Sequence, residues 1–554
     1  MELLRGDGGL AAARAIFAEP GIPVLEVVPH ARAGGALAAV ALASAASAIV
    51  LDPAATPGLA ALLASTSPLG AHDAKTVERV LLRTLGSGAP RWACLRLTEM
   101  LLAGGRPVEL GPADIAARYG VELADPSAGL DAFAQHARGL AQVLAAQVPL
   151  LKRDGLTWPS RIEAGAVAPL AAMEHHGMAF DAERWKALDI ATERERVDVR
   201  RQLLGVFSAR GERDLLGAAP VDLDNDHALK QALARLGHPV ADARRATLAA
   251  LPPPLGPMLA RYRELQKLAN AYGESFLTHV SADGRLHATF EQIGASTGRL
   301  SCREPNLQSI VKDAPYRECF RAPPGRTLVI GDYATCELRI LAEMSGDPVF
   351  AEAFARGEDL HSTVASRVFG KPVSKTQNPE LRERAKAVNF GLVYGMGAGG
   401  LARAVDVDLR QAEDLLRRYF ETFPRIGAFL ARTAHEALER GFARTLTGRR
   451  LYLDAGPDRS SRGAAERVAK NMPIQGTSAD ITKIALSRIH GRLAAEPGAF
   501  MVNTVHDEIV VECDEARAAS IHETLATEMQ AAGAEVLRSV PVAVDVATSR
   551  FWRK

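Results

Sequence analysis

The sequence predicts a protein of several domains, in which a small α/β domain precedes a larger α+β region that is rich in helices. Its 554 residues are enough for several domains of roughly 100–200 residues each. The first 155 residues alternate short β-like runs (IPVLEVV and SAIVL) with helical patterns, as α/β domains do. Beyond them, helix-forming segments dominate, and the apolar runs TLVIGDY and MVNTVHDEIVV predict strands.

The composition is that of an ordinary globular protein. Apolar residues make up 47% of the chain and charged residues 24%, with a formal net charge of +1. Residues 33–51 carry no charge, but alanine and serine dominate them, so we expect a buried helix running into a strand and no membrane span. The beginning of the chain lacks the order of a signal peptide. Five scattered cysteines without a CxxC pair argue against disulfides and zinc, and fit a reducing cytosol.

Basic residues gather in two segments, although the whole chain is almost neutral. Residues 299–326 contain six basic and three acidic residues, and residues 432–470 contain nine and five. Segments of this kind are usually solvated faces. Beside a site for phosphate chemistry, they would instead form a groove that follows a nucleic-acid backbone.

Two aspartates at the edges of the predicted strands are candidate metal ligands. Asp332 ends the first apolar run, and Asp507 lies in the second, 175 positions further along the chain. Mg²⁺ is often bound by one or two carboxylates together with water and substrate phosphates. An isolated aspartate after a strand is more often a helix cap, but the pair favours phosphoryl transfer at a metal site.

The segment RERAKAVNFGLVYG (382–395) can be drawn as a helix on which Arg382, Lys386, Phe390 and Tyr394 are spaced four apart. At about 1.5 Å of rise per residue, Phe390 lies about 12 Å from Arg382. That span fits one nucleotide, with its triphosphate at the cationic end. The alternative is an amphipathic surface helix with no binding role. Its NFG and YG sequences argue against that alternative, because they weaken the helix and a purely structural helix has no need of them.

These motifs, in this order and at these separations, resemble those of the family A DNA polymerases, the group typified by bacterial DNA polymerase I. The resemblance covers roughly residues 160–554 and includes ASTGRLSCREPNLQSI (295–310), DLHSTVASRVFG (359–370) and ERVAKNMPIQGTSADITK (466–483). It implies an enzyme that adds dNTPs to a primer 3′-hydroxyl by two-metal phosphoryl transfer and releases pyrophosphate. DNA repair, gap filling or replication would be its role, and lesion bypass or reverse transcription would extend its substrate range.

The resemblance also implies a right-hand fold, with an antiparallel palm sheet and helical fingers and thumb, behind a small RNase H-like, exonuclease-type α/β domain. We expect the exonuclease-like domain at 1–155 and the polymerase domain at 156–554, with no 5′-nuclease domain. Within the polymerase domain, we expect the thumb at about 185–285, the palm at about 286–345 and 471–554, and the fingers at about 346–470.

By resemblance, Asp332 and Asp507 bridge two Mg²⁺ ions, which Mn²⁺ can replace, and the carbonyl of Tyr333 completes one metal site. Lys386 is expected to protonate the leaving pyrophosphate. Glu508, beside Asp507, completes the expected catalytic group.

The same resemblance assigns the incoming dNTP to the 382–395 helix. Arg382, Lys386 and His361 bind its phosphates, Phe390 packs on its sugar or base, and Tyr394 caps the templating position. Phe390 in place of tyrosine implies discrimination against sugars that lack a 3′-hydroxyl. Glu337 blocks a ribose 2′-hydroxyl and bonds to Tyr394, which favours deoxynucleotides.

Primer–template DNA is the other implied partner. Arg299 and Gln475 resemble the pair that contacts minor-groove acceptors at the primer end, which lie alike in every correct base pair. His506 is expected to contact the primer end. The remaining expected DNA contacts are Arg467, Asn471, Asn306 and Gln308. We expect a monomer that works in the cytoplasm, associated with the nucleoid.

The sequence departs from the family pattern in two places. Glu383 stands where a second arginine is common, and Arg384 beside it is an imperfect substitute, so nucleotide binding should be weakened. Ala334, Thr335 and Cys336 replace the commoner Ser-Gln-Ile, which shortens the polar reach near the primer and could change fidelity or speed.

The first 155 residues lack the ligands that a 3′→5′ exonuclease needs. Two-metal hydrolysis requires a D-x-E pair and two later aspartates, and no D-x-E occurs before residue 150. Asp73 and Glu78 are the only candidates in the second motif, but their surroundings do not match. Phe133 and Ala137 stand where tyrosine and aspartate are usual. We expect an inactive exonuclease scaffold, with an unrelated α/β domain as the alternative.

Two other classes of function compete with the polymerase. A catalytically silent DNA-binding scaffold is disfavoured because Asp332, Asp507, Lys386 and Arg382 are all present. A nuclease that acts through the N-terminal domain is disfavoured by the missing ligands.

Overall fold

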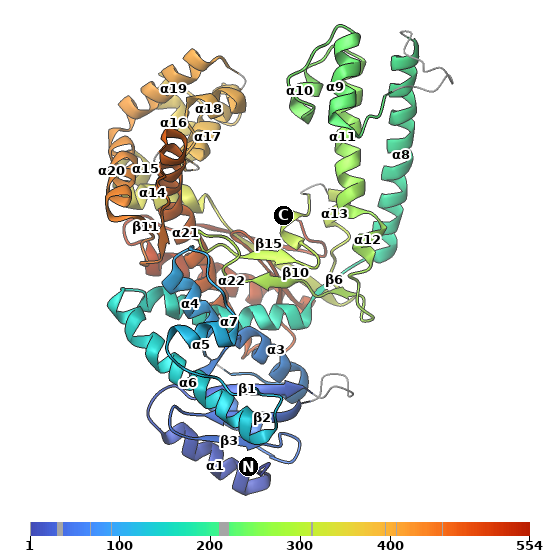
Figure 1. Cartoon of the computed structure of the whole chain (residues 1–554). Helices are drawn as coiled ribbons and strands as arrows, with labels where there is room; N and C mark the ends of the chain where they lie inside the picture. Colours follow the sequence, from blue (N-terminus) through green and yellow to red (C-terminus); the bar gives the residue numbers. More distant parts are fainter. Residues whose placement is uncertain are drawn as a thin grey trace.

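The computed structural model (Figure 1) describes residues 2–29, 37–66, 68–89, 91–209, 221–311, 314–393, 395–405, 407–456 and 458–553. Its N-terminal domain contains a five-stranded sheet in the order β3-β2-β1-β4-β5, in which β1 runs antiparallel to β2 and parallel to β4. The strands are β1 (Val24–Pro29), β2 (Leu37–Ala43), β3 (Ala48–Leu51), β4 (Leu69–Ala71) and β5 (Trp92–Cys94). The helices of this part are α1 (Gly6–Ala18), α2 (Leu59–Ser65), α3 (Ala74–Leu85), α4 (Leu95–Ala103), α5 (Pro112–Arg118) and α6 (Leu130–Arg153). The expected α/β domain is therefore confirmed as a fold.

The buried helix expected ahead of SAIVL is wrong for residues 37–43, which form the strand β2 and pair with both β1 and β3. Residues 33–36 lie outside the described residues. Ala39, Ala41 and Ala43 face one side and pack with Phe133 of α6, whereas Val40 and Leu42 face the other side. Helices cover both sides of the strand, so both sets of side chains are apolar. The two-residue period was therefore hidden within a uniformly apolar run.

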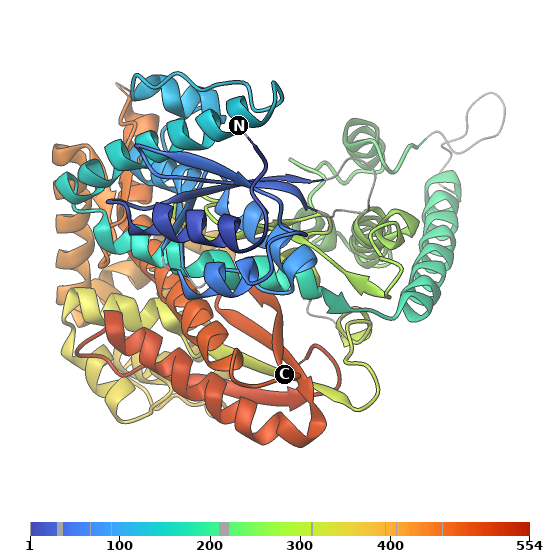
Figure 2. The same ribbon diagram turned by 90° about the horizontal axis from the view of Figure 1, so that it is seen from below.

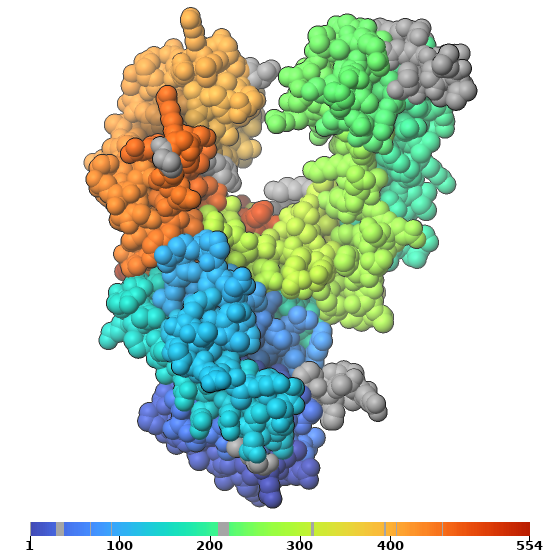
Figure 3. All heavy atoms as spheres, in the orientation of Figure 1, coloured from blue at the N-terminus to red at the C-terminus, as the bar shows by residue number. Residues whose placement is uncertain are grey.

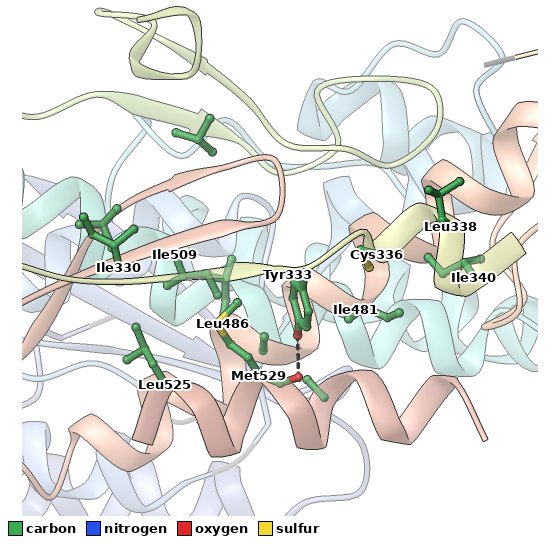
Figure 4. Packing of buried hydrophobic residues seen from close by; sticks show 14 of the residues in the cluster. Ile330, Tyr333, Cys336, Leu338, Ile340, Ile481, Leu486, Ile509, Leu525 and Met529 are labelled. Carbon is green, nitrogen blue, oxygen red and sulfur yellow. Dashed lines mark hydrogen bonds between the residues drawn. The ribbon is translucent and has the colours of Figure 1, made fainter. Parts of the chain in front are cut away.

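The second part of the chain is built around the four-stranded antiparallel sheet β13-β14-β10-β15. Its strands are β10 (Arg326–Tyr333), β13 (Phe500–Val505), β14 (Glu508–Asp514) and β15 (Val544–Ser549), which confirms both apolar runs as strands. The helix α22 (Ala518–Val536) covers one face of the sheet (Figure 4). Gly331 permits this close approach, because a Cβ at that position would lie 2.6 Å from the Met529 sulfur. The Tyr333 hydroxyl donates to the Met529 carbonyl at 2.8 Å.

Two helical lobes rise on either side of this sheet, and Figure 3 shows a deep cleft between them. One lobe contains α8 (Ala182–Ala209), α9 (Asp226–Arg235), α10 (Arg245–Ala249), α11 (Leu255–Tyr272) and α12 (Glu274–Leu277). The other contains α14 (Cys336–Ser345), α15 (Pro348–Ala355), α16 (Leu360–Phe369), α17 (Pro379–Val393), α18 (Ala398–Val405), α19 (Leu409–Thr422) and α20 (Pro424–Arg440). The helical character expected for both regions is confirmed.

The remaining elements connect these parts. They are α7 (Thr157–His176), β6 (Met178–Ala179), β7 (Arg285–Leu286), β8 (Thr289–Glu291), β9 (Ser301–Arg303), a 3₁₀ turn (Leu307–Ser309), α13 (Ala314–Arg317), β11 (Phe442–Arg444), β12 (Arg450–Tyr452), α21 (Arg459–Leu493) and a second 3₁₀ turn (Glu515–Arg517). No helix in the described ranges is both long and apolar enough to cross a bilayer.

The N-terminal domain is packed firmly against the rest of the chain (Figure 2). Glu174 of α7 is buried and forms ion pairs with Lys75 and Arg79 of α3. At a second contact, the Tyr452 amide donates to the Gly104 carbonyl at 2.9 Å, and the Arg106 guanidinium lies 3.8 Å from the Tyr452 ring centroid. The helix α7 itself is shared, because its Val167 packs in the N-terminal core while Ile162 packs in the core around the antiparallel sheet.

Four fully buried charges form a network where α7, α21 and the β11–β12 hairpin meet. Glu163 of α7 accepts from Lys483 of α21 at 2.6 Å and pairs with Arg449 of the hairpin. Arg449 also donates to Asp480 of α21 at 2.6 and 3.0 Å. Lys483 makes a second bond of 2.8 Å to the carbonyl of Gly298. Two acids and two bases thus compensate each other in a site closed to water.

Replacing Glu163 by glutamine should destabilise the protein strongly, because Lys483 and Arg449 would then share the single carboxylate of Asp480. Removing one partner of a buried ion pair costs about 3–5 kcal/mol. The expected result is a lower urea midpoint for unfolding, followed by circular dichroism. Glu421→Gln, which removes an exposed partner of Arg417, is the control and should change the midpoint little. Equal midpoints for both variants would contradict the assigned role of the network.

Candidate active site

Asp332 and Asp507 meet at one edge of the antiparallel sheet. Asp332 lies near the end of β10, opposite Glu508 of β14, and Asp507 lies in the two-residue turn between β13 and β14. The turn places the Asp507 carboxyl within hydrogen-bonding reach of the Asp332 carboxyl. His506, the first residue of the turn, has a φ of 58°, the positive value that such tight hairpins favour.

The electrostatics of this pair suit a cation. Burial raises the pKa of Asp507 to about 7, and the negative charge of Asp332 acts in the same direction. Two carboxylates so close together cannot both ionise cheaply unless a positive charge lies between them. Among the described residues, no group of three or more His, Cys, Asp and Glu side chains is arranged around a metal position. Two carboxylates nevertheless fit Mg²⁺, which takes its other ligands from water and phosphate oxygens.

Glu508 is adjacent to Asp507 in the sequence, but its carboxyl group is engaged elsewhere. One of its oxygens accepts from the Trp552 indole at 2.6 Å, and the other lies 3.7 Å from an Arg317 nitrogen. The Arg317 guanidinium also stacks over the Trp552 ring at 4.2 Å. These contacts favour a supporting role for Glu508 beside the two aspartates.

A pocket of about 380 Å³ opens beside Asp507, between the sheet edge, α14, α17 and α21. Of the expected site residues, it brings together side chains that are far apart in the sequence. They are Arg299, Tyr333, Glu337, Phe390, His506 and Asp507. The other residues around it are Leu300, Thr335, Cys336, Ser478, Ala479 and Thr482.

Glu337 and Arg299 form an ion pair at this pocket. Glu337 lies in the first turn of α14 and is buried, while Arg299 follows Gly298, whose carbonyl is held by Lys483. Sequence reasoning paired Glu337 with Tyr394 instead, and Tyr394 lies outside the described residues. The expected sugar-selecting acid and the expected minor-groove reader therefore hold each other in this structure.

The cationic end of α17 is arranged as the helical spacing predicts, with Arg382 and Lys386 one turn apart. Asp359, which precedes α16, binds Arg382 through both of its oxygens, at 2.6 and 3.1 Å. Although burial opposes it, hydrogen bonds from Arg382 and Ser362 lower the pKa of Asp359 to about 2. The sequence did not predict Asp359 as the partner of Arg382, although its position two residues before His361 was a signal that it lies near the expected phosphate-binding residues.

His361 of α16 is buried and neutral. Burial, together with the charges of Arg382 and Lys386, lowers its pKa to about 4 in spite of the opposing charge of Asp359. Its Nδ1 lies 3.1 Å from the side-chain amide nitrogen (Nδ2) of Asn389, and its ring centroid lies 5.6 Å from that of Phe390. His361 therefore adjoins the nucleotide helix as a hydrogen-bonding group without a charge.

Arg467, Asn471 and Gln475 follow one another at four-residue intervals along α21, as expected. The end of α17 approaches this helix closely, because a Cβ at Gly395 would lie 3.1 Å from the Arg467 carbonyl. The Asn471 Oδ1 is buried and has no hydrogen-bond partner among the described residues, so an external donor would satisfy it.

Asn306 and Gln308 stabilise their own turn. The Asn306 side chain accepts from the Gln308 amide at 3.0 Å, and the Gln308 side chain donates to the Thr504 carbonyl at 3.3 Å. This places the turn against β13, close to the hairpin that carries Asp507.

The expected exonuclease positions have structural roles. Asp73 caps α3 and pairs with Arg96 at 3.2 Å. Glu78 is buried and accepts from the Ala89 amide at 2.9 Å and from the Trp92 indole at 2.8 Å. Phe133 and Ala137 pack on the sheet.

Glu26 of β1 adjoins this region, at the C-terminal edge of the parallel strands. Its carboxyl accepts from the His72 amide at 3.2 Å. Burial raises its pKa from 4.5 to about 7, and the charge of Asp73 acts in the same direction. Glu26 is thus an acid that the fold keeps partly protonated near neutral pH.

Replacing Glu26 by glutamine should stabilise the protein at pH 8 but not at pH 4. As the pH rises from about 4.5 to about 7, the unfolded chain loses this proton while the folded protein keeps it, so wild-type stability falls. Glutamine cannot ionise and should recover on the order of 2 kcal/mol at pH 8. Urea unfolding at both pH values measures the difference, with the exposed Glu122→Gln as control. A gain of the same size at pH 4 would contradict this assignment.

Comparison with known proteins agrees with this geometry. Residues 229–554 match the family model described as DNA polymerase family A. The chain is similar to the thermostable DNA polymerase I of Thermus filiformis, with 34% identity over 80% of this chain and 53% of the relative. It is also similar to DNA polymerase I of Pseudomonas aeruginosa, with 35% identity over 71% of this chain and 44% of the relative. The chain thus spans about half the length of the curated relatives that it matches.

A solved structure matches almost the entire chain. It is the POL domain of Pol1 from M. smegmatis in complex with DNA primer–template and dNTP, with a TM-score of 0.81, 28% identity and 99% of each chain covered.

Proposed function

The chain belongs to DNA polymerase family A, and on this premise we propose that it extends a primer along a DNA template. One observation carries the proposal: Asp507, hydrogen-bonded to Asp332, lines the same pocket as Phe390 of the nucleotide helix α17. The proposed partners are primer–template DNA and dNTPs, as in the M. smegmatis complex. The protein would work as a cytoplasmic monomer.

In the proposed reaction, the primer 3′-oxygen attacks the α-phosphorus in line, its bond to phosphorus forms, and the bond to pyrophosphate breaks. Asp332 and Asp507 would hold Mg²⁺ or Mn²⁺, which lowers the pKa of the 3′-hydroxyl and neutralises the triphosphate when bound. Arg382 and Lys386 would orient the phosphates, and Lys386 would give its proton to the departing pyrophosphate.

The DNA would enter the cleft between the two helical lobes. We assign α8–α12 to the thumb, the antiparallel sheet and α14 to the palm, and α15–α20 to the fingers. Arg299, Gln475, Asn471, Arg467 and His506 would contact the DNA around the primer end. The unsatisfied oxygen of Asn471 supports this placement.

Dideoxy and ribose sugars would be disfavoured by two side chains of the pocket. Phe390 offers no hydroxyl to replace a missing 3′-hydroxyl, and Glu337 would occupy the space of a ribose 2′-hydroxyl. The ion pair between Glu337 and Arg299 would have to rearrange as the base pair enters.

We further propose that the N-terminal domain supports the polymerase without cutting DNA. Asp73 and Glu78 are committed to a helix cap, to Arg96 and to Trp92, which supports this proposal. Its contacts with α7, together with those of Gly104 and Arg106 with Tyr452 of the β11–β12 hairpin, give it a structural task.

Replacing either aspartate by asparagine should abolish primer extension, because the cation would lose one of its two carboxylates. We expect a rate reduced at least about 10³-fold, equivalent to several kcal/mol of lost transition-state stabilisation. Extension of a labelled primer on a DNA template, with and without Mg²⁺, measures it. Asp414→Asn, at a partly exposed position of α19, should extend like wild type. Extension by Asp332→Asn or Asp507→Asn at the wild-type rate would refute the metal assignment.

A mismatched primer end should persist when the protein is incubated with Mg²⁺ but without dNTPs. The domain would lack the carboxylates for two-metal hydrolysis, so no shortening of the labelled primer is expected. Asp73→Ala provides the decisive comparison. Shortening by wild type that this variant loses would establish an exonuclease and overturn the proposed inactivity.

A further inference from the structure

An acidic side chain lies between the two cations of the nucleotide helix. One oxygen of Glu383 accepts from an Arg382 nitrogen at 3.0 Å, and the other lies 3.7 Å from the Lys386 ammonium. Glu383 is on the same helix, α17, as both cations. A single carboxylate thus bridges the two groups that are assigned to the triphosphate.

The contacts at this end of α17 leave no net charge. Arg382 and Lys386 contribute two positive charges, and Asp359 and Glu383 contribute two negative charges. His361 adds none, because burial and the neighbouring cations lower its pKa to about 4. An incoming triphosphate would therefore meet cations that already have anionic partners.

The two carboxylates hold Arg382 in different ways. Asp359 is 29% exposed and binds through both oxygens from the N-terminal boundary of α16, which fixes the direction of the guanidinium. Glu383 is 61% exposed and makes single contacts, so its side chain can turn into solvent. Asp359 is suited to positioning Arg382, whereas Glu383 occupies hydrogen-bonding positions that a phosphate would use.

We propose that Glu383 competes with the triphosphate of the incoming dNTP for Arg382 and Lys386, and thereby sets the nucleotide affinity of the enzyme. This inference rests on the proposed polymerase function. The Glu383 contacts stabilise only the nucleotide-free state and must break before nucleotide binds. They therefore raise KM for dNTP and leave kcat almost unchanged, because they are absent from both the bound complex and the transition state.

Glu383→Gln tests the proposal, since glutamine keeps the size of the side chain and removes its charge. Each exposed ion pair is weak, and two such pairs correspond to about a threefold to tenfold lower KM for dNTP. The matched control is Glu380→Gln, the same charge change at an exposed position one turn earlier on α17. The control should change KM less than twofold. The difference should shrink when the ionic strength rises, because salt screens exposed charges.

Equilibrium binding of dATP in the presence of Mg²⁺, measured by calorimetry, provides a readout that does not depend on extension. We expect about threefold to tenfold tighter binding by Glu383→Gln than by wild type. Equal affinities, or equal gains in Glu383→Gln and Glu380→Gln, would overturn the proposal. A wild-type protein that binds dATP but extends no primer would instead refute the proposed function and leave the competition intact. A wild type that binds no dATP at any concentration would refute both.

Discussion

The compensation of buried charge by Glu163, Arg449, Asp480 and Lys483 is the constraint on which the rest of the site depends. Each of these groups would be costly to bury alone, and each is acceptable only because at least one oppositely charged member of the set is held at hydrogen-bonding distance. Since the four residues come from α7, α21 and the β11–β12 hairpin, their mutual requirement fixes these elements against one another. The bond from Lys483 to the Gly298 carbonyl extends the constraint to Arg299, which lines the pocket.

A second electrostatic constraint acts where Asp332 and Asp507 meet. Asp332 and Asp507 are brought together by strand pairing and a tight turn. Where the buried network pairs acids with bases, this pair sets one carboxyl group beside another, and burial together with the charge of Asp332 raises the pKa of Asp507 to about 7. The contrast separates the part of the molecule that maintains the fold from the part that we propose to bind metal and nucleotide.

The sequence was a good guide wherever local pattern and long-range pairing agreed. The run TLVIGDY and the spacing of Arg382, Lys386 and Phe390 predicted β10 and α17, because period and burial coincide there. It failed for β2, whose two faces are both apolar and give no alternation. It also could not supply Glu163 or Lys483 as partners, because an ion pair between distant segments leaves no periodic trace. The Glu337–Arg299 pair was missed for the same reason.

The shared helix α7 has a consequence for the history of the N-terminal domain. One side of this helix completes the N-terminal core through Val167, and the other side completes the core around the antiparallel sheet through Ile162. Removing the first 155 residues would therefore expose an apolar surface of α7 on the remaining part of the chain. Selection against aggregation would therefore retain the folded body of this domain whether or not it cuts DNA.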